Sequence, residues 1–228
     1  MSYVWPKIIP GAQRDVDYFI NIPWCRDQFI HPDVLAVPRL DDKQDGRGST
    51  GKLFSETLNS ASTISHRIVV FRDPSSTPTL NPSSKKRWLP IETCSVFCTL
   101  GDGVCGFGDI CHGGVQATLL DDVMGVLGIF NARLQHGMIP TKVAGFCSPE
   151  TNPGMLDLIT SMIATQGIEV QYLRPLRVPK VIQITASMGE ISDDGTLFVV
   201  YAVIKDGNGK EYAKAKARWA VFPLKGKL

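Results

Sequence analysis

One segment constrains the fold of this chain more than any other: residues 112–128, which read HGGVQATLLDDVMGVLG. Its apolar residues surround a helix on nearly every side, so we expect this helix to be buried in the core of the domain. Two adjacent carboxylates, Asp121 and Asp122, lie inside it. An unpaired buried charge is costly, so these carboxylates need either partners or a function.

Helical periodicity separates the two carboxylates. The face that carries Asp121 is otherwise lined by small residues, and it leaves room for another backbone or a substrate to approach. These small residues are Gly114, Ala117, Gly125 and Gly128. Asp122 shares a less open face with Thr118 and Ile129. If one aspartate is functional, we expect it to be Asp121; the alternative is that either carboxylate only bonds to a strand across the core.

The start of the helix offers a second functional group. Gly113 and Gly114 leave backbone N–H groups unblocked by side chains at the positive end of the helix dipole. Such amides can stabilise an oxyanion when a carbonyl is attacked, and His112 adds a polar group at the same end. Asp121 lies about two turns further along, roughly 10 Å in axial rise. We therefore expect a composite site in which two subunits of a dimer supply the two groups.

Strand patterns occur on both sides of the helix: four segments alternate apolar and polar residues, residues 65–71 are rich in β-branched residues, and residues 197–204 form a continuous apolar run. The predicted strands span residues 65–71, 92–100, 165–173, 181–188, 197–204 and 211–222. The turn Asp206-Gly207-Asn208-Gly209 joins the last two as a hairpin. Sequential strands form an antiparallel sheet, and one sheet curled around one helix buries that helix economically. We therefore expect an α+β fold in which an antiparallel sheet wraps around a long central helix.

The remaining residues predict an extension and an insertion. Residues 1–60 are expected to form a mostly helical and irregular N-terminal extension that packs on the main domain, because their aromatic content is too high for a disordered tail. The main domain then spans residues 61–228. It carries an insertion at about 138–163, in which residues 155–163 predict a short helix. Surface loops are expected at residues 41–51 and 72–90.

Composition argues against several classes of partner. The chain has 24 basic and 22 acidic residues, a balance that does not favour nucleic acid or an anionic membrane. No apolar run approaches the length of roughly 20 residues that a membrane helix needs. The N-terminal residues do not resemble a signal peptide. We expect a cytoplasmic protein whose six cysteines are free thiols.

At the central helix the sequence resembles the hotdog-fold acyl-CoA thioesterases, most closely the branch that holds the phenylacetyl-CoA and THEM-type thioesterases. The matching residues are His112-Gly113-Gly114, Thr118-Leu119-Leu120-Asp121 and Met124-Gly125. A second match, TQGIEVQYLRP at residues 165–175, is similar to a family strand that begins with threonine and ends in Tyr-Leu-Arg-Pro. The chain departs from the family in the thirty or so residues between the helix and Thr165, where the family has a short connection.

The resemblance implies a hydrolase that acts on an acyl-CoA or acyl-carrier thioester without a cofactor or metal. It implies a homodimer or homotetramer with its site between subunits. Asp121 would act as general base or nucleophile, the backbone amide near Gly114 as oxyanion donor, and His112 close to the thioester carbonyl. Thr165 would orient the water or the carboxylate. Further residues expected at the substrate are Gly113, Asp122, Gly125 and Arg174.

Two other kinds of function stay open. The same fold can perform a non-hydrolytic reaction, such as dehydration, decarboxylation or cyclisation of a biosynthetic intermediate, and the glycine-rich loop and the insertion motivate this alternative. A non-catalytic acyl-binding protein is the other, although the His112, Gly-Gly and Asp121 set argues against it.

Several isolated motifs carry weaker alternatives. Residues 101–106 satisfy GxGxxG, but a dinucleotide site would need a helix to open at the third glycine. Cys111 beside His112 could act as a nucleophile, although adjacent side chains seldom point at each other. A zinc site could be formed by Cys94, Cys98, Cys105, Cys111 and His112, but buried cysteine is more often a small apolar residue. A basic row could contact a CoA phosphate or could simply face solvent. This row consists of Lys214, Lys216 and Arg218.

Overall fold

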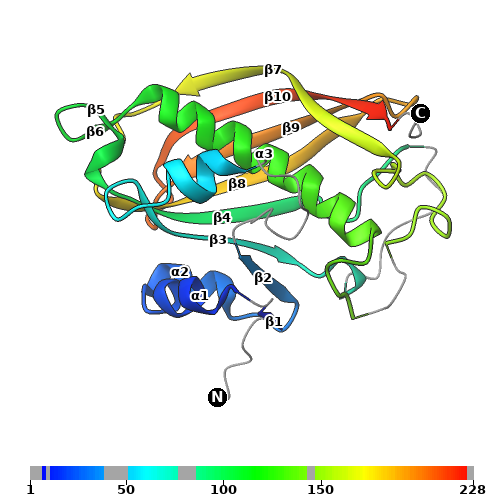
Figure 1. Ribbon diagram of the computed structural model, residues 1–228, viewed down its shortest axis with the longest axis horizontal. Coiled ribbons are helices and arrows are strands. Elements are labelled where there is room, and N and C mark those ends of the chain that lie inside the picture. Colours follow the sequence, from blue (N-terminus) through cyan, green and yellow to red (C-terminus); the bar gives the residue numbers. More distant parts are fainter. Residues whose placement is uncertain (1–6, 9–10, 39–50, 77–85, 143–146, 225–228) are drawn as a thin grey trace.

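The computed structural model describes residues 7–8, 11–38, 51–76, 86–142 and 147–224. An eight-stranded sheet curls around one long helix, α3 (Gly113–Gln135), which lies in its concave face (Figure 1). This arrangement confirms the predicted α+β hotdog fold. The surface loops predicted at 41–51 and 72–90 fall partly outside the described residues.

The strands of the large sheet run in the order β1-β2-β3-β4-β8-β9-β10-β7. The pair β1–β2 is parallel, and every other neighbouring pair is antiparallel. Their bounds are β1 (Lys7–Ile8), β2 (Val34–Pro38), β3 (Ile64–Arg72), β4 (Thr93–Leu100), β8 (Lys180–Ile191), β9 (Leu197–Lys205), β10 (Glu211–Pro223) and β7 (Ser161–Tyr172). Two short strands, β5 (Cys105–Phe107) and β6 (Ile110–Cys111), form a separate hairpin just before α3.

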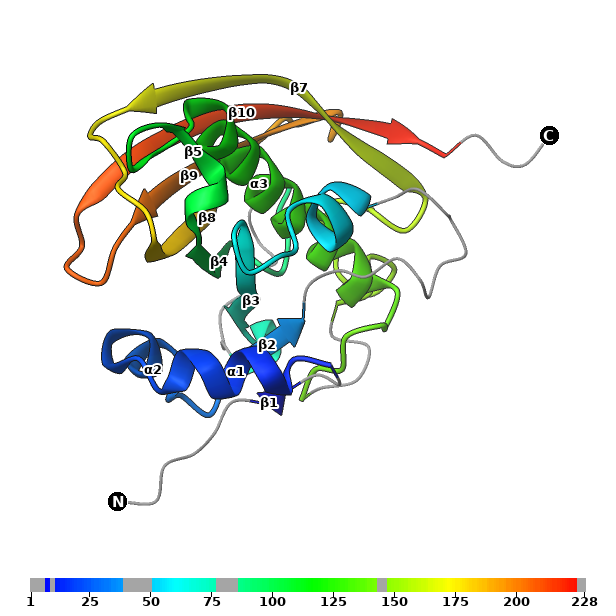
Figure 2. The ribbon, with the colours of Figure 1, turned by 60° about the vertical axis from the view of Figure 1, so that its left-hand side comes forward.

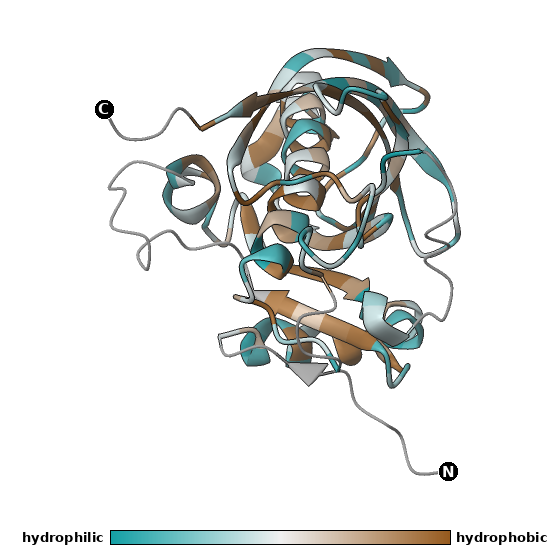
Figure 3. Cartoon of the chain, turned by 90° about the vertical axis from the view of Figure 1, so that its right-hand side faces the viewer, coloured by the Kyte–Doolittle hydropathy of each residue, from teal (hydrophilic) through white to brown (hydrophobic). Residues whose placement is uncertain are grey.

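The helix α3 is buried because the sheet surrounds it. Leu119, Leu120, Val123 and Leu127 are fully buried, and all four belong to one apolar cluster with the inner faces of the strands. By length and composition alone α3 could cross a membrane, which the sequence had not suggested. Its apolar side chains instead belong to one cluster with those of the surrounding strands. Figure 3 shows the backbone of the sheet curving around the helix.

The N-terminal extension is more than a helical cover. It was expected to be helical and irregular, but it also adds β1 and β2 to the edge of the sheet. Its helices α1 (Gln13–Ile20) and α2 (Pro23–Phe29) pack on the outer face of β3 and β4, where Phe19 and Phe29 contact Phe97. Both faces of β3 are therefore covered, which explains why its sequence is a continuous apolar run rather than an alternating one.

The short helix predicted at residues 155–163 is absent, and this prediction is wrong. The Asp157 carboxylate accepts hydrogen bonds from the Ile159 amide (2.7 Å) and the Thr160 hydroxyl (2.6 Å), which form a local turn that competes with a helix. β7 then begins at Ser161. The apolar spacing that suggested a helix reflects burial against α3, where Gln135 hydrogen-bonds the backbone at both Leu156 and Leu158.

A β-bulge in β7 decides which of its side chains face α3. Trp219 of β10 pairs with Thr165, but the next residue back along β10, Arg218, pairs with Gly167, so one residue of β7 is extra. Thr165 and Tyr172 are seven positions apart and would point to opposite faces of a regular strand. With the bulge, each lies opposite a buried residue of β10, and both face the helix.

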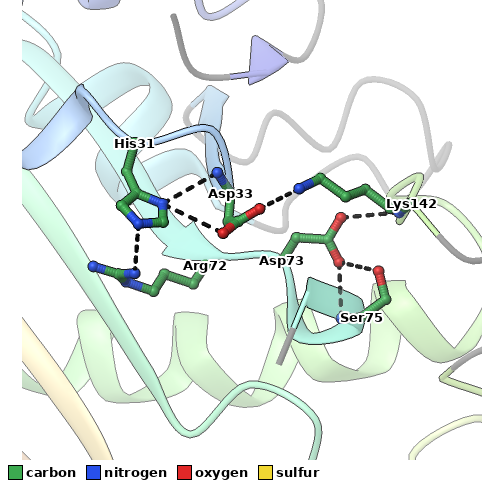
Figure 4. A network of polar contacts seen from close by, with 6 residues as sticks. All are labelled: His31, Asp33, Arg72, Asp73, Ser75 and Lys142. Atoms are coloured by element: carbon green, nitrogen blue, oxygen red, sulfur yellow. Dashed lines mark hydrogen bonds and ion pairs between the residues drawn. The ribbon is translucent and has the colours of Figure 1, made fainter. Parts of the chain in front are cut away.

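A polar network joins the extension, the end of β3 and the insertion (Figure 4). Asp73, which is 1% exposed, accepts hydrogen bonds from the Ser75 amide (2.9 Å), the Ser75 hydroxyl (2.6 Å) and the Lys142 amide (2.9 Å). The Lys142 ammonium pairs with Asp33, and this contact holds the pKa of the Asp33 carboxyl below its usual value. Arg72 donates to the His31 imidazole at 3.2 Å. These contacts tie three segments that are distant in sequence.

Replacing Asp73 with Asn should lower the free energy of unfolding by about 2–3 kcal/mol, because the buried carboxylate would lose charge-assisted hydrogen bonds. Urea unfolding at neutral pH measures this change. Asp194→Asn is the matched control, since Asp194 accepts similar bonds from Ser192 and Thr196 in an exposed hairpin. Water can replace those bonds, so the control should lose less stability. Equal losses in the two variants would contradict the role assigned to burial.

Candidate active site

The imidazole of His112 caps the start of α3. His112 Nδ1 accepts a hydrogen bond from the Gly114 amide at 2.9 Å, and the His112 carbonyl accepts one from the Gln116 amide at 3.1 Å. Because Nδ1 is an acceptor, the neutral ring carries its proton on Nε2. The side chain is exposed, so His112 presents an N–H donor at the mouth of the helix.

This cap changes which amide can meet an oxyanion. The Gly114 amide was expected to be free, but it is occupied by His112 Nδ1 in this structure. The Gly113 amide comes before the first intrahelical bond, and no acceptor among the described residues takes its N–H. The donors available at the helix start therefore include the Gly113 N–H and the Nε2–H of His112.

Tyr172 closes one side of this helix start. Its hydroxyl donates to the Gly113 carbonyl at 2.8 Å, and its side chain remains 51% exposed. The sequence analysis missed this residue because simple alternation along β7 puts Tyr172 and Thr165 on opposite faces. The bulge between them could not be read from the spacing, although Gly167 at that point is a possible signal.

The β5–β6 hairpin lies beside the helix start, where a Cβ atom added at Gly106 would be 3.1 Å from the His112 ring. One guanidinium nitrogen of Arg177 donates to both carboxylate oxygens of Asp109 (2.5 and 2.6 Å). This ion pair holds the hairpin against the segment that follows β7, and it lowers the pKa of the Asp109 carboxyl. Phe107 near the hairpin tip is 75% exposed. The glycines at 101–106 thus build a turn and a hairpin, and the helix does not open at the third of them, so the dinucleotide-site alternative is not supported.

Asp121 points from α3 towards β7. Thr165 Oγ1 donates to Asp121 Oδ1 at 2.9 Å, and the Asp121 side chain is half-buried while Thr165 is exposed. Among the described residues no hydrogen-bond donor contacts the second carboxylate oxygen. The structure thus brings together two residues that the sequence placed in one site, although they are 44 positions apart.

Asp122 points the other way, towards β3. It forms an ion pair with Arg67, whose guanidinium also lies over the Phe54 ring at 4.8 Å from its centroid. The sequence analysis did not predict a role for Arg67, because the apolar residues that follow it indicate only a buried strand. Its position was nevertheless readable: Arg67, Val69 and Phe71 alternate on the inner face of β3.

The glycine face of α3 is filled rather than open. A Cβ atom added at Gly125 would lie 2.9 Å from the Trp219 ring, and one added at Gly128 would lie 2.3 Å from Ile163. These glycines let β10 and β7 pack closely against the helix. Gly125, which was expected at the substrate, is therefore buried beneath the indole of Trp219.

Arg174 and the basic row lie apart from Asp121. Arg174, also expected at the substrate, donates to the Glu211 carbonyl at 2.8 Å. Residues of β10 alternate between a buried inner face and an exposed outer face. The outer face carries Lys214, Lys216 and Arg218, which project away from α3. Their position supports the solvated-face interpretation over a CoA-phosphate contact beside Asp121.

The cysteines carry free thiols, and most of them are buried. Burial raises the pKa of the Cys94 and Cys111 thiols to about 12. The Cys111 thiol donates a weak hydrogen bond to the His112 carbonyl oxygen at 3.8 Å, so it bonds to the backbone and not to the imidazole. This geometry does not support the nucleophile alternative. No group of three His, Cys, Asp or Glu side chains within the described ranges is placed to hold a metal ion.

A pocket of about 520 Å³ lies elsewhere, where the extension meets the start of β4. None of His112, Asp121 and Thr165 lines it. Its walls include Gln28, Val34, Phe71, Arg72, Ile91 and Cys94.

No protein-family model matches the chain. The chain is 53% identical over 221 residues to verlamelin biosynthesis protein B of Lecanicillium sp, covering 97% of this chain and 94% of that protein. Three solved structures align with 58% of this chain at a TM-score of 0.43. A Haemophilus influenzae thioesterase is 13% identical to this chain, and the alignment covers 73% of its length. Two further structures are each 17% identical to this chain. One is a hypothetical thioesterase of Streptococcus pneumoniae with coenzyme A, 80% of whose length is aligned, and the other is a Streptococcus mutans protein bound to acetyl-CoA, 82% of whose length is aligned.

The native protein should resist thiol labelling at Cys111. The raised pKa leaves almost no thiolate at mildly alkaline pH, and burial blocks access of the reagent. Labelling with iodoacetamide followed by peptide mass spectrometry should modify the half-buried Cys105 first, and all six cysteines only after denaturation. Rapid native labelling of Cys111 would restore the nucleophile alternative.

Proposed function

This chain belongs to the family of verlamelin biosynthesis protein B, and on that premise we propose that it hydrolyses an acyl thioester carried by coenzyme A or an acyl carrier. The pairing of Asp121 with Thr165 on the inner face of β7 carries the proposal. A carboxylate oriented by a hydroxyl, with one oxygen left free, suits a general base or a nucleophile. The motif residues around His112 and Asp121 resemble those of the hotdog thioesterases.

The proposed reaction uses the groups at both places on α3. The Asp121 carboxylate accepts a proton from water while the oxygen of that water attacks the thioester carbon. The carbonyl oxygen becomes an oxyanion that accepts hydrogen bonds from His112 Nε2–H and the Gly113 amide. The carbon–sulfur bond then breaks, and the thiolate leaves and takes up a proton. In the nucleophilic version, Asp121 attacks first and water cleaves the resulting anhydride.

The distance along the helix calls for two subunits. His112 and Asp121 are nine residues apart, which is about 13 Å of axial rise and too far for one carbonyl to contact both. We place the Asp121 of one protomer opposite the helix start of its partner. Among the described strands β7 is the outermost and pairs only with β10, so its free edge can pair with β7 of a second copy. Exposed apolar residues on β7, Met162 and Ile168, would be covered there.

The name of the 53% identical relative refers to a biosynthetic pathway. We therefore propose that the acyl group belongs to a biosynthetic intermediate and that the protein acts in the cytoplasm. A dehydration, decarboxylation or cyclisation of such an intermediate would use the same carboxylate but release no thiol. An acyl-binding protein would release no thiol and alter no intermediate. Detection of free thiol therefore separates the hydrolase from both alternatives.

Asp121→Asn should reduce kcat by about 100-fold or more, because the amide cannot accept the proton of the attacking water. Thiol release from a panel of acyl-CoA and acyl-pantetheine substrates measures this loss. Glu190→Gln, on an exposed part of β8, is the matched control and should keep wild-type kcat. Undiminished turnover in Asp121→Asn would show that another group performs the reaction.

A composite site makes a second prediction. His112→Ala and Asp121→Asn homodimers should each be inactive, since each lacks one of the two groups at every site. Co-expressed subunits form mixed dimers in which one site is intact, so activity should return to about a quarter of the wild-type value. Activity that stays absent in verified mixed dimers would place both groups of a site on one subunit.

A further inference from the structure

The ion pair between Arg67 and Asp122 lies in an unusual place for two charges. Arg67 occupies an inward position of β3 between Ile64 and Val69, opposite Cys98 of β4, and it is only 4% exposed. Burying an ion pair seldom adds stability over an apolar pair of the same size. The pair therefore calls for an explanation other than stability.

The contacts of Arg67 hold its guanidinium between Asp122 and the N-terminal extension. One end of its guanidinium binds Asp122, its face covers the Phe54 ring, and its buried Nε has no hydrogen-bond acceptor among the described residues. Phe54 belongs to η2 (Leu53–Thr57), a short turn of the N-terminal extension. This turn lies beside α3 (Figure 2, cyan). The extension thus covers the pair and limits the access of water to it.

The two adjacent carboxylates of α3 are held from opposite directions. Consecutive helical residues diverge by about 100°. Asp121 bonds to Thr165 on β7, whereas Asp122 bonds to Arg67 on β3, and four other strands separate β7 from β3 in the sheet. Two such contacts on different sides hold the orientation of the helix turn that carries both carboxylates.

Other contacts hold the later turns of the helix: Gly125 and Gly128 pack closely under β10 and β7, and Asn131 hydrogen-bonds the backbone of Ile91. Nonspecific apolar burial would not fix the earlier turn that carries Asp121 and Asp122. Hydrophobic burial is non-directional, and α3 is apolar on almost every side, so several rotations would bury similar apolar area. A directional charge pair selects one of them. We propose that Arg67 is a positioning residue that acts through Asp122 and sets the rotation of α3 at which Asp121 meets Thr165. This inference rests on the proposed function, in which Asp121 is the catalytic carboxylate.

The first test is the kinetics of Arg67→Met. Rotation of the helix would misplace Asp121, so kcat should fall by about 10- to 100-fold. KM should change by less than about threefold, since Arg67 does not face the substrate. Arg67→Lys keeps the charge with a shorter reach, and its kcat should lie between the two. Val69→Ala, the next inward residue of β3, is the matched control for a packing defect and should keep kcat. Wild-type kcat in Arg67→Met would overturn the proposal.

The second test separates position from stability. The double variant Arg67→Met/Asp122→Leu replaces the buried ion pair with an apolar pair, which should restore thermal stability even where Arg67→Met folds poorly. Its kcat should stay low, because the turn that carries Asp121 has lost its directional contact with β3. A stable double variant with wild-type kcat would contradict the proposal.

A double-mutant cycle gives a readout that a structural role would not move. Arg67 and Thr165 lie on different sides of α3, and distant independent residues have additive effects. If Arg67 acts by bringing Asp121 to Thr165, the kcat losses of Arg67→Met and Thr165→Val should not multiply in the double variant. Multiplied losses would show independent action and overturn the proposal. Val69→Ala/Thr165→Val should lose only as much kcat as Thr165→Val alone.

A structural measurement keeps this inference separate from the proposed function. If the wild-type protein releases no thiol from any substrate, the proposed hydrolase activity fails. Crystal structures of the wild-type protein and Arg67→Met then test the positioning role alone. The contact between Thr165 Oγ1 and Asp121 Oδ1, 2.9 Å here, should break in the variant. An unchanged contact in Arg67→Met would overturn the positioning role.

Discussion

A helix that is apolar on nearly every side has to be enclosed, and two adjacent carboxylates on it have to be satisfied inside the enclosure. Both requirements are met by a sheet that curls far enough to approach α3 from two directions. β7 supplies the Thr165 hydroxyl to Asp121, and β3 supplies the Arg67 guanidinium to Asp122. The curvature of the sheet therefore both buries the apolar helix and brings a partner to each of its two carboxylates.

The N-terminal extension supports this enclosure at its other edge. It adds β1 and β2 to the sheet, covers the outer face of β3 with two helices, and places Phe54 over Arg67. The network of Asp33, Asp73 and Lys142 joins it to the insertion that precedes β7. The extension, which lies outside the minimal fold, is thus connected to the insertion that leads into β7. β7 carries Thr165, which contacts Asp121.

Periodicity predicted the central helix and most strands of the sheet, whereas only the resemblance to the hotdog thioesterases placed Thr165 in the same site as Asp121. It could not predict the β7 bulge, because an extra residue leaves no mark in a two-residue alternation, and Tyr172 was missed for that reason. Gly125 was misread because glycine spacing does not tell whether a substrate or the Trp219 ring fills the space. Asp157 replaced an expected helix by a local turn, a competition that apolar spacing does not reveal.

The most direct test of the account is a crystal structure of the Asp121→Asn variant with a non-hydrolysable thioether analogue of an acyl-CoA. The account predicts that the atom in place of the thioester carbon lies within about 3–4 Å of the residue-121 side chain, directly or through one water. It also predicts that the acyl oxygen faces the helix start of the partner subunit. An analogue bound with its acyl group elsewhere, such as in the pocket lined by Phe71 and Cys94, would contradict the account.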